Sequence, residues 1–85
     1  MKVSYSKNFL KQYTNLSPNI QKKTDERILI WNTNPLDPLL RNHSLKGKSS
    51  KYRSINITGD YRALYVQTEK ELIFDAIGTH SQLYG

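Results

Sequence analysis

Apolar residues recur at helical spacing in the first third of the chain. Phe9, Leu10 and Tyr13 follow Ser6 at intervals close to a helical turn, and Leu16 closes the segment. A serine before such a run is a typical N-cap, because its hydroxyl accepts a hydrogen bond from a free backbone N–H of the first turn. The pattern therefore predicts a short helix that begins just after Ser6.

A second helix is predicted by the same kind of signal, so that residues 6–33 are mostly helical. Ser17 and Pro18 fit an N-cap and a first-turn proline, whose missing N–H costs nothing at that position. The segment 32–35 (NTNP) ends this helix, since a residue before proline avoids the helical conformation. The turn PLDP follows. The apolar stripe of the helix would bury Ile20, either Thr24 or the stem of Arg27, Ile28 and Trp31.

The second half of the chain alternates as strands do. Residues 52–57 and 61–66 are rich in β-branched and aromatic side chains, and a short segment with Gly59 and Asp60 separates them. Two such runs around a glycine-containing turn predict a hairpin. Residues 71–77 form a third predicted strand after a polar turn.

Two helices followed by three consecutive strands indicate an α+β fold. Both helices would pack on one face of a small antiparallel β-sheet. A chain of 85 residues has room for a single domain, 1–85. The opposite face of the sheet would stay open, and an open sheet face is a natural binding surface.

The charge of the chain indicates what such a surface would bind. Lys and Arg number 13 against 7 Asp and Glu, which gives a net charge of +6. A strong positive field on a small surface favours a polyanion. An acidic protein would satisfy the same field, and ordinary solubility charge is the plainer alternative. The candidate RNA-binding cations fall in one stretch without an acid: Lys46, Lys48, Lys51 and Arg53.

Composition also excludes several classes of protein. The absence of cysteine rules out disulfides, thiolate metal sites and cysteine nucleophiles, and it fits a cytoplasmic setting. The longest apolar run, residues 28–31, is far too short to span a membrane, and the strand-like start at residues 1–5 lacks the core of a signal peptide. With no acidic cluster and no ligand spacing between histidines, we expect neither a metal nor a cofactor.

Only two histidines occur, His43 and His80, each after a polar residue in a predicted loop. Taken alone, such a histidine is usually an ordinary surface residue. In a basic domain the pair suggests RNA cleavage, because RNA carries its own nucleophile, the 2′-hydroxyl. The reaction needs a base at that hydroxyl and an acid at the leaving 5′-oxygen, and histidine, with a pKa of about 6.5, serves either role. Arginine suits the negative charge of the phosphorane.

Other candidate residues also fit ordinary structural roles. Asp60 fits ordinary hairpin-turn chemistry, and Arg53 and Arg62 fit paired surface charges. Strand tyrosines are commonly half-buried, although an exposed one beside a basic face stacks well on an RNA base. The sequence leaves both readings open for Tyr52, Tyr61, Tyr65 and Tyr84.

Several segments stand in an order that is similar to a known family. They are PLDP (35–38), NHSLKGK (42–48), YR (52–53), GDYRALY (59–65) and IGTHSQLYG (77–85). Together they resemble the YafQ branch of the RelE/ParE toxin superfamily over nearly the whole chain. The specific parts are the ending Gly-Thr-His-Ser-x-Leu-aromatic-Gly and the upstream His-x-Leu-x-Gly. The Asp-Tyr-Arg-x-Leu-Tyr strand is shared more widely, including by members that poison gyrase.

The resemblance implies a ribosome-dependent, metal-independent mRNA endoribonuclease. An antitoxin would neutralise it by wrapping an acidic segment over the basic face, so the toxin is expected to be a monomer alone and a hetero-oligomer with the antitoxin. At matching positions, His80 would act as general acid or base at the scissile phosphate, with His43 assisting. Asp60 would orient a histidine or the substrate. Tyr84 would hold the nucleotide, and Arg62 would stabilise the phosphate.

This chain departs from the family pattern at three positions. Asn56 stands where YafQ-like toxins often carry another histidine, and Ala76 lies in the segment where an arginine often precedes Gly-Thr-His. Arg62 or Arg53 would then have to supply the missing cation. The aromatic residue after the turn aspartate is Tyr61 rather than tryptophan, and we expect it to contact RNA.

Three functions are therefore open. The first is the RNA-cleaving toxin, which requires both histidines. The second is a non-enzymatic toxin that binds gyrase in the manner of ParE, for which neither histidine matters. The third is a degenerate toxin that only binds its acidic partner. The motif contexts of His43 and His80 favour the first over the second.

Overall fold

The protein is described by a computed structural model that covers residues 2–47 and 51–84. Within those residues, no helix is long and apolar enough to cross a membrane. The elements follow in the order β1 (Lys2–Tyr5), α1 (Lys7–Thr14), α2 (Pro18–Thr33), the 3₁₀ turn η1 (Pro38–Leu40), β2 (His43–Ser44), β3 (Tyr52–Asn56), β4 (Tyr61–Gln67), β5 (Glu71–Thr79) and α3 (His80–Tyr84).

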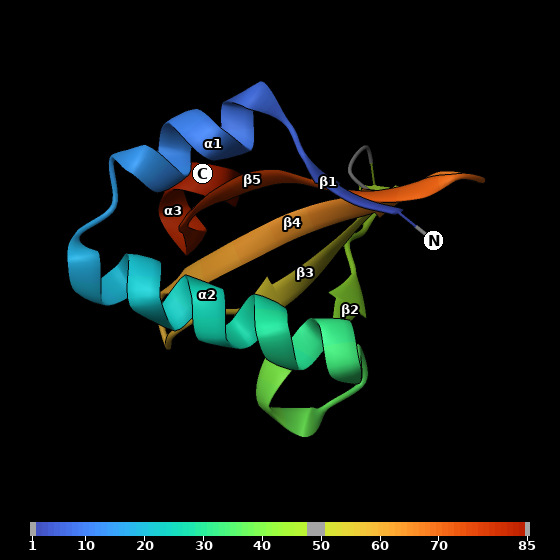
Figure 1. The fold of residues 1–85 in the computed structure, drawn as a ribbon, viewed down its shortest axis with the longest axis horizontal. Coiled ribbons are helices and arrows are strands. Elements are labelled where there is room, and N and C mark those ends of the chain that lie inside the picture. Colours follow the sequence, from blue (N-terminus) through green and yellow to red (C-terminus); the bar gives the residue numbers. More distant parts are fainter. Residues whose placement is uncertain (1, 48–50, 85) are drawn as a thin grey trace.

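The strands form one five-stranded sheet in the order β1-β5-β4-β3-β2 (Figure 1). The predicted α+β class is confirmed, and the three predicted strands are the antiparallel centre of the sheet. The strand-like start of the chain is β1, which pairs in parallel with β5, so the sheet is mixed rather than purely antiparallel. Alternation along a strand does not reveal its neighbour or its direction, which is why the sequence did not predict this pairing.

Both long helices begin where the sequence predicted. The hydroxyls of Ser6 and Ser17 each accept a hydrogen bond from the backbone N–H three residues later, at 3.0 and 3.4 Å. In α2, Thr24 rather than the stem of Arg27 faces the core, and its hydroxyl donates back to the carbonyl of Ile20 at 2.7 Å. Arg27 instead donates to the carbonyl of Leu39 at 3.0 Å, which attaches η1 to the helix.

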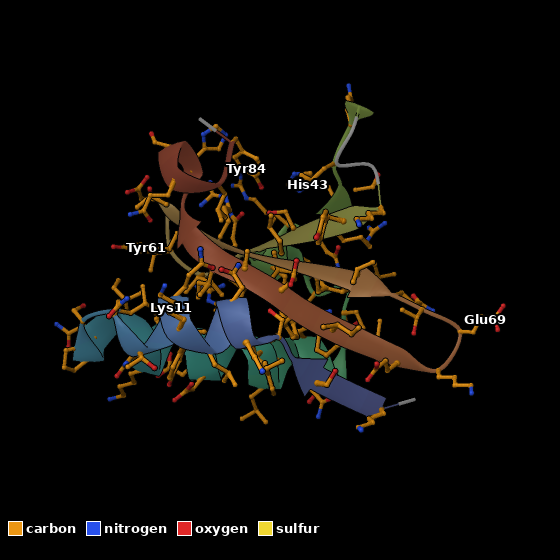
Figure 2. The ribbon with its side chains drawn as sticks, turned by 90° about the horizontal axis from the view of Figure 1, so that it is seen from above. Lys11, His43, Tyr61, Glu69 and Tyr84 are labelled. Atoms are coloured by element: carbon orange, nitrogen blue, oxygen red, sulfur yellow. The ribbon has the colours of Figure 1, made fainter. Side chains whose placement is uncertain are left out.

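Aromatic side chains fill the core between the helices and the sheet. The Trp31 ring lies edge-on to Phe74 and Tyr65, with centroids 4.9 and 5.1 Å apart. Phe9 of α1 packs on the same Phe74 ring. Both long helices therefore cover one face of the sheet (Figures 1 and 2), and the other face remains open except for α3 at one end. That open face carries the candidate site.

Candidate active site

The open face is built from side chains that alternate with the core. Asn56 of β3, Arg62 of β4 and Gly78 of β5 are paired neighbours in one row across the sheet. In the next row, His43 of β2 pairs with Ser54. Because successive residues of a strand point to opposite faces, these residues lie on the face of the sheet away from the core. The neighbours that lie in the core are Ile55, Ala63 and Ile77.

A groove of about 450 Å³ lies at the end of this face, between β2 and α3. It brings together four of the five predicted catalytic residues from separate parts of the chain. Figure 2 shows His43 and Tyr84 on the side of the sheet away from the helix residue Lys11. The groove is lined by Arg41, His43, Leu45, Asn56, Arg62, His80 and Tyr84. Two guanidinium groups and two imidazoles, with no carboxylate among these described residues, suit the binding of an anion.

The orientation of His43 is fixed by a local hydrogen bond. Its Nδ1 atom lies 2.8 Å from the carbonyl oxygen of Arg41. Because a carbonyl only accepts, Nδ1 carries the proton, and the neutral ring keeps a free lone pair on Nε2. The ring is exposed and lines the groove. The geometry therefore leaves Nε2 available to take a proton from a bound molecule.

His80 begins the short helix α3, where the chain turns after β5. Its backbone N–H donates to the carbonyl of Asp60 at 3.1 Å, which ties the start of α3 to the β3–β4 hairpin. Its ring packs edge-on to Tyr84, one helical turn later, with centroids 4.5 Å apart. Tyr84 keeps 39% of its surface exposed, so its ring remains accessible from the groove.

Gln82 closes the turn that carries His80. Its side-chain oxygen accepts a hydrogen bond from the Thr79 backbone N–H at 2.9 Å, and the Gln82 backbone N–H donates to the Thr79 hydroxyl at 3.2 Å. A Cβ at Gly78 would lie 2.8 Å from the same Gln82 oxygen, so a larger residue there would displace the end of the Gln82 side chain. The first turn of α3 is thus packed directly against the end of β5.

Arg62 is held by the hairpin that precedes it. One terminal nitrogen, Nη1, donates to the carbonyls of Thr58 and Gly59, both at 3.0 Å, and to that of Tyr61 at 3.1 Å. The guanidinium therefore stabilises the β3–β4 turn as well as lining the groove. Part of its hydrogen-bonding capacity is already used within the protein.

Arg41 is a groove residue that sequence reasoning missed. It ends η1 in the left-handed backbone conformation, with a φ of 46°, and it lines the groove. A cation directly before Asn42-His43 was the available signal. The turn that brings Arg41 to the groove has no marker in the sequence, because the residue at the left-handed position is not glycine.

The structure does not bring every predicted residue to the groove. Asp60 lies exposed in the hairpin turn and meets His80 only through its backbone carbonyl. Tyr61 is half-buried against the core. Arg53 is paired with Tyr65, which lies in the core, so its side chain leaves β3 on the helix side of the sheet. There its Nε donates to the Asn42 side-chain oxygen at 2.8 Å.

Of the predicted RNA-binding lysines, Lys46 and Lys51 lie outside the residues that line the groove. Lys46 is exposed on the loop after β2, and Lys51 lies with its ammonium 5.3 Å from the centroid of the Tyr52 ring. Lys48 lies outside the described residues. The Tyr52 hydroxyl donates to the Asp75 carboxylate at 2.6 Å, and this hydrogen bond raises the pKa of Tyr52 above its ordinary value.

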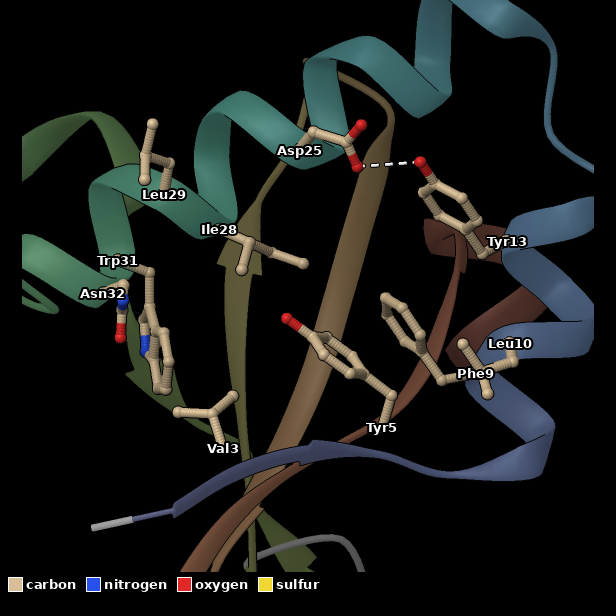
Figure 3. Close-up of a pocket in the computed structure, with 10 residues that line it drawn as sticks. All are labelled: Val3, Tyr5, Phe9, Leu10, Tyr13, Asp25, Ile28, Leu29, Trp31 and Asn32. Atoms are coloured by element: carbon tan, nitrogen blue, oxygen red, sulfur yellow. Dashed lines mark hydrogen bonds between the residues drawn. The ribbon is translucent and has the colours of Figure 1, made fainter.

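A second hollow, of about 490 Å³, lies on the opposite side of the molecule between β1, α1 and α2 (Figure 3). Its walls are mostly apolar, with Tyr5, Leu10 and Leu29 partly exposed at its surface. At one end the Tyr13 hydroxyl donates to Asp25 at 2.8 Å. Neither histidine belongs to its lining, so it lacks the acid–base groups of the first groove. Among the described residues, no group of three or more His, Cys, Asp or Glu side chains could hold a metal ion.

Known proteins similar to this chain point to one family. The chain is 38% identical to the mRNA interferase toxin YafQ of Escherichia coli K12 over 58 residues, which are 68% of this chain and 63% of that protein. The aligned part thus spans less than two thirds of that curated relative. The YafQ structure in the E. coli DinJ–YafQ complex is 30% identical, covers 99% of this chain and 98% of that chain, and superposes with a TM-score of 0.74.

The fold extends to more distant toxins. The YoeB/ParE toxin from Agrobacterium tumefaciens is 21% identical, covers 94% of this chain and 99% of that chain, and superposes with a TM-score of 0.76, which shows a shared fold. The family model described as a bacterial toxin of type II toxin–antitoxin systems, YafQ, matches residues 1–85. The resemblance seen in the sequence is confirmed: this chain belongs to the YafQ family of bacterial toxins of type II toxin–antitoxin systems.

Proposed function

We propose that this protein is the toxin of a toxin–antitoxin pair and cuts messenger RNA by acid–base catalysis in the groove between β2 and α3. The observation that carries the proposal is the convergence of His43, His80, Arg62 and Tyr84 in one cationic groove. The name mRNA interferase of the E. coli relative supports the same activity. No group other than these side chains and the RNA 2′-hydroxyl is needed for the reaction.

In the proposed reaction, His43 takes the proton of the 2′-hydroxyl through Nε2. The supporting contact is the hydrogen bond from Nδ1 to the Arg41 carbonyl, which leaves Nε2 unprotonated in the neutral ring. The 2′-oxygen then bonds to phosphorus while the bond from phosphorus to the 5′-oxygen breaks. His80, in its protonated form, gives a proton to that leaving oxygen. The products are a 2′,3′-cyclic phosphate and a free 5′-hydroxyl.

Binding of the RNA is assigned to the rest of the open face. Tyr84 would stack on a base beside the cleaved bond, since its ring is accessible and its edge-on contact with His80 holds it at the groove. The positive charge of the groove would offset the charge that develops on the phosphorane. Lys46 and Lys51, which are exposed at the two ends of the β2–β3 connection, would contact the RNA backbone.

Two partners complete the proposal. The ribosome would present the mRNA, and an antitoxin with an acidic segment would cover the open basic face. Support for the second comes from the E. coli relative, which forms the DinJ–YafQ complex. A net charge of +6 favours an acidic partner on electrostatic grounds.

Primer extension on a reporter mRNA in a translation extract tests the activity. Wild-type protein, His80→Ala and His43→Ala are compared, with and without an inhibitor of initiation. We expect discrete cuts that depend on translation and are lost in both variants. Lys70→Ala is the matched control, because Lys70 is exposed in the β4–β5 turn and distant from the groove along the sheet.

The folded state of each variant is checked by circular dichroism and by co-purification with the antitoxin. A folded His80→Ala protein that still cuts would remove His80 from the mechanism. Intact mRNA with the wild-type protein, together with inhibited gyrase supercoiling, would replace the nuclease proposal by the gyrase-binding alternative.

A further inference from the structure

We infer that Arg41 binds the scissile phosphate, and that Arg62 serves mainly to position the β3–β4 hairpin. This inference rests on the proposed nuclease function and assigns the cation of the groove to a residue that the sequence motifs did not indicate. Both arginines line the same groove. They differ in how much of their hydrogen-bonding capacity the protein itself uses.

Arg62 uses one of its three side-chain nitrogens within the protein. Its Nη1 atom donates to three carbonyls of the hairpin turn, those of Thr58, Gly59 and Tyr61. A guanidinium binds a phosphate best through two parallel N–H groups of its planar fork. With Nη1 held by the turn, the end-on fork of Nη1 and Nη2 is closed to a bidentate contact, and only the side-on fork of Nε and Nη2 is left to Arg62.

Arg41 has its whole guanidinium available. Within residues 2–47 and 51–84, its side-chain nitrogens make no hydrogen bond or ion pair, and Arg41 is one of the residues that line the groove. Its backbone is used instead: the N–H donates to the Pro38 carbonyl at 3.3 Å, and the carbonyl accepts from His43 Nδ1 at 2.8 Å. One residue therefore orients the proposed base through its backbone and presents a free cation through its side chain.

The turn that carries Arg41 is anchored to the core by the next residue. The Asn42 side-chain amide donates to the Pro35 carbonyl at 3.0 Å and to the hydroxyl of the buried Tyr65 at 2.7 Å. Its oxygen accepts from Arg53 Nε at 2.8 Å. These three contacts hold the backbone at Arg41, including its left-handed φ of 46°, in one position. A cation on a fixed backbone loses less freedom when it binds.

The chemistry defines what Arg41 would contact. As the 2′-oxygen attacks, the two non-bridging oxygens of the phosphate gain negative charge, and the guanidinium would donate hydrogen bonds to one or both of them. No proton is transferred in this contact, because an arginine side chain stays protonated. Strand β5 contributes no cation, so the arginines that line the groove and are available to the phosphate are Arg41 and Arg62.

The test uses single-turnover cleavage of ribosome-bound mRNA at a mapped cut site, with an ordinary phosphate or with either phosphorothioate isomer at that bond. We expect Arg41→Ala to lower the cleavage rate about 10²- to 10³-fold, the loss typical of one transition-state donor. Sulfur replacing the contacted oxygen should slow the wild type, and that difference should disappear in Arg41→Ala. Arg41→Lys should restore only part of the rate, because a lysine ammonium cannot donate the two parallel hydrogen bonds that a guanidinium donates.

Arg62→Ala and Lys22→Ala are the comparisons. Arg62→Ala should lower the midpoint of thermal unfolding while its phosphorothioate difference stays that of the wild type. Lys22→Ala, on exposed surface of α2 on the other face of the sheet, should match the wild type throughout. An Arg41→Ala protein with wild-type rate, or a phosphorothioate difference lost in Arg62→Ala instead, would overturn the assignment.

A binding measurement separates this inference from the proposed function. RNA with a 2′-deoxy residue at the cut site cannot react, so its affinity for the isolated toxin is measured against salt. Arg41→Ala should reduce the slope of log K against log salt by about 0.7, the value for one phosphate contact on a single strand. A wild type that binds but never cuts would overturn the nuclease proposal, while an unchanged slope would overturn the phosphate contact of Arg41.

Discussion

The hydroxyl of Tyr84 donates a hydrogen bond to the buried hydroxyl oxygen of Ser54 at 3.1 Å. Ser54 is the β3 residue that pairs with His43, and Tyr84 ends the helix that His80 begins. The two histidines, which the sequence places in separate loops, are therefore connected through one contact between α3 and the open face of the sheet. The groove depends on the docking of α3, which consists of five residues.

Replacing Tyr84 by phenylalanine should loosen α3. The change removes the hydrogen bond and leaves the buried Ser54 hydroxyl without this partner, which should cost about 1 kcal/mol of unfolding free energy. Cleavage should fall as well, since His80 would be less well held. Urea unfolding of Tyr84→Phe, Ser54→Ala and the double variant measures the coupling between the two hydroxyls. A coupling energy of zero would mean that the contact does not hold α3 in place.

Gly78→Ala should impair activity more than stability. The added Cβ would lie 2.8 Å from the Gln82 side-chain oxygen, which must then move and release its hydrogen bond to the Thr79 N–H. The first turn of α3 would shift, and His80 with it. We expect a loss of at least tenfold in the cleavage rate, with a small change in the urea midpoint. Gly59→Ala is the matched control, because a Cβ at Gly59 meets no atom within 4 Å.

Alkaline pH should destabilise the protein through two tyrosines. Hydrogen bonds to Asp75 and Asp25 raise the pKa of Tyr52 and Tyr13, respectively, above the ordinary value of 10.0. The folded state then holds these phenolic protons more tightly than the unfolded state does. Stability from this source is complete below about pH 10 and is lost as the pH rises through the folded pKa.

Urea unfolding between pH 8 and about pH 11 checks this expectation. Tyr52→Phe and Tyr13→Phe should each reduce the decline in unfolding free energy above pH 10. Tyr5→Phe should leave it unchanged, since the Tyr5 hydroxyl makes no hydrogen bond among the described residues. A steeper alkaline decline in Tyr52→Phe than in the wild type would contradict the sign of the effect.

Local signals in the sequence were enough for most of the fold. The helix starts are marked by Ser6, Ser17 and Pro18. These residues act through hydrogen bonds and dihedral limits within four residues, so the helix starts can be predicted without the tertiary structure. The pairing of β1 with β5 joins residues about seventy positions apart, and nothing local encodes it. The five-residue helix α3 was not predicted either. Its contacts with Gly78 and Ser54 hold it in place, and its own sequence carries no apolar stripe that would mark a helix.

Part of the groove could be predicted from the sequence. His43 and His80 were singled out because imidazoles are scarce in the chain and stand in motif-like contexts, and the fold brings both to one groove. Arg53 was assigned to the basic face by its place in a run of cations. Its strand position points it to the other side, since β3 alternates and Tyr65, its paired neighbour, is buried. Arg41 was not predicted because a turn brings it to the groove, and no spacing of residues in the sequence marks that turn.

Antitoxin binding should depend on the open face of the sheet rather than on the helices. An acidic segment that crosses that face and continues past the β2–β3 connection would meet the exposed Lys46 and Lys51, so Lys46→Glu and Lys51→Glu should each slow association and weaken its dependence on salt. Each exposed pair is worth at most about 1 kcal/mol, so the double variant gives the clearer loss. Lys22→Glu on α2 makes the same charge change on the other face. Association kinetics with the purified antitoxin at three salt concentrations would decide the matter, because a larger effect of Lys22→Glu would place the antitoxin along the helices instead.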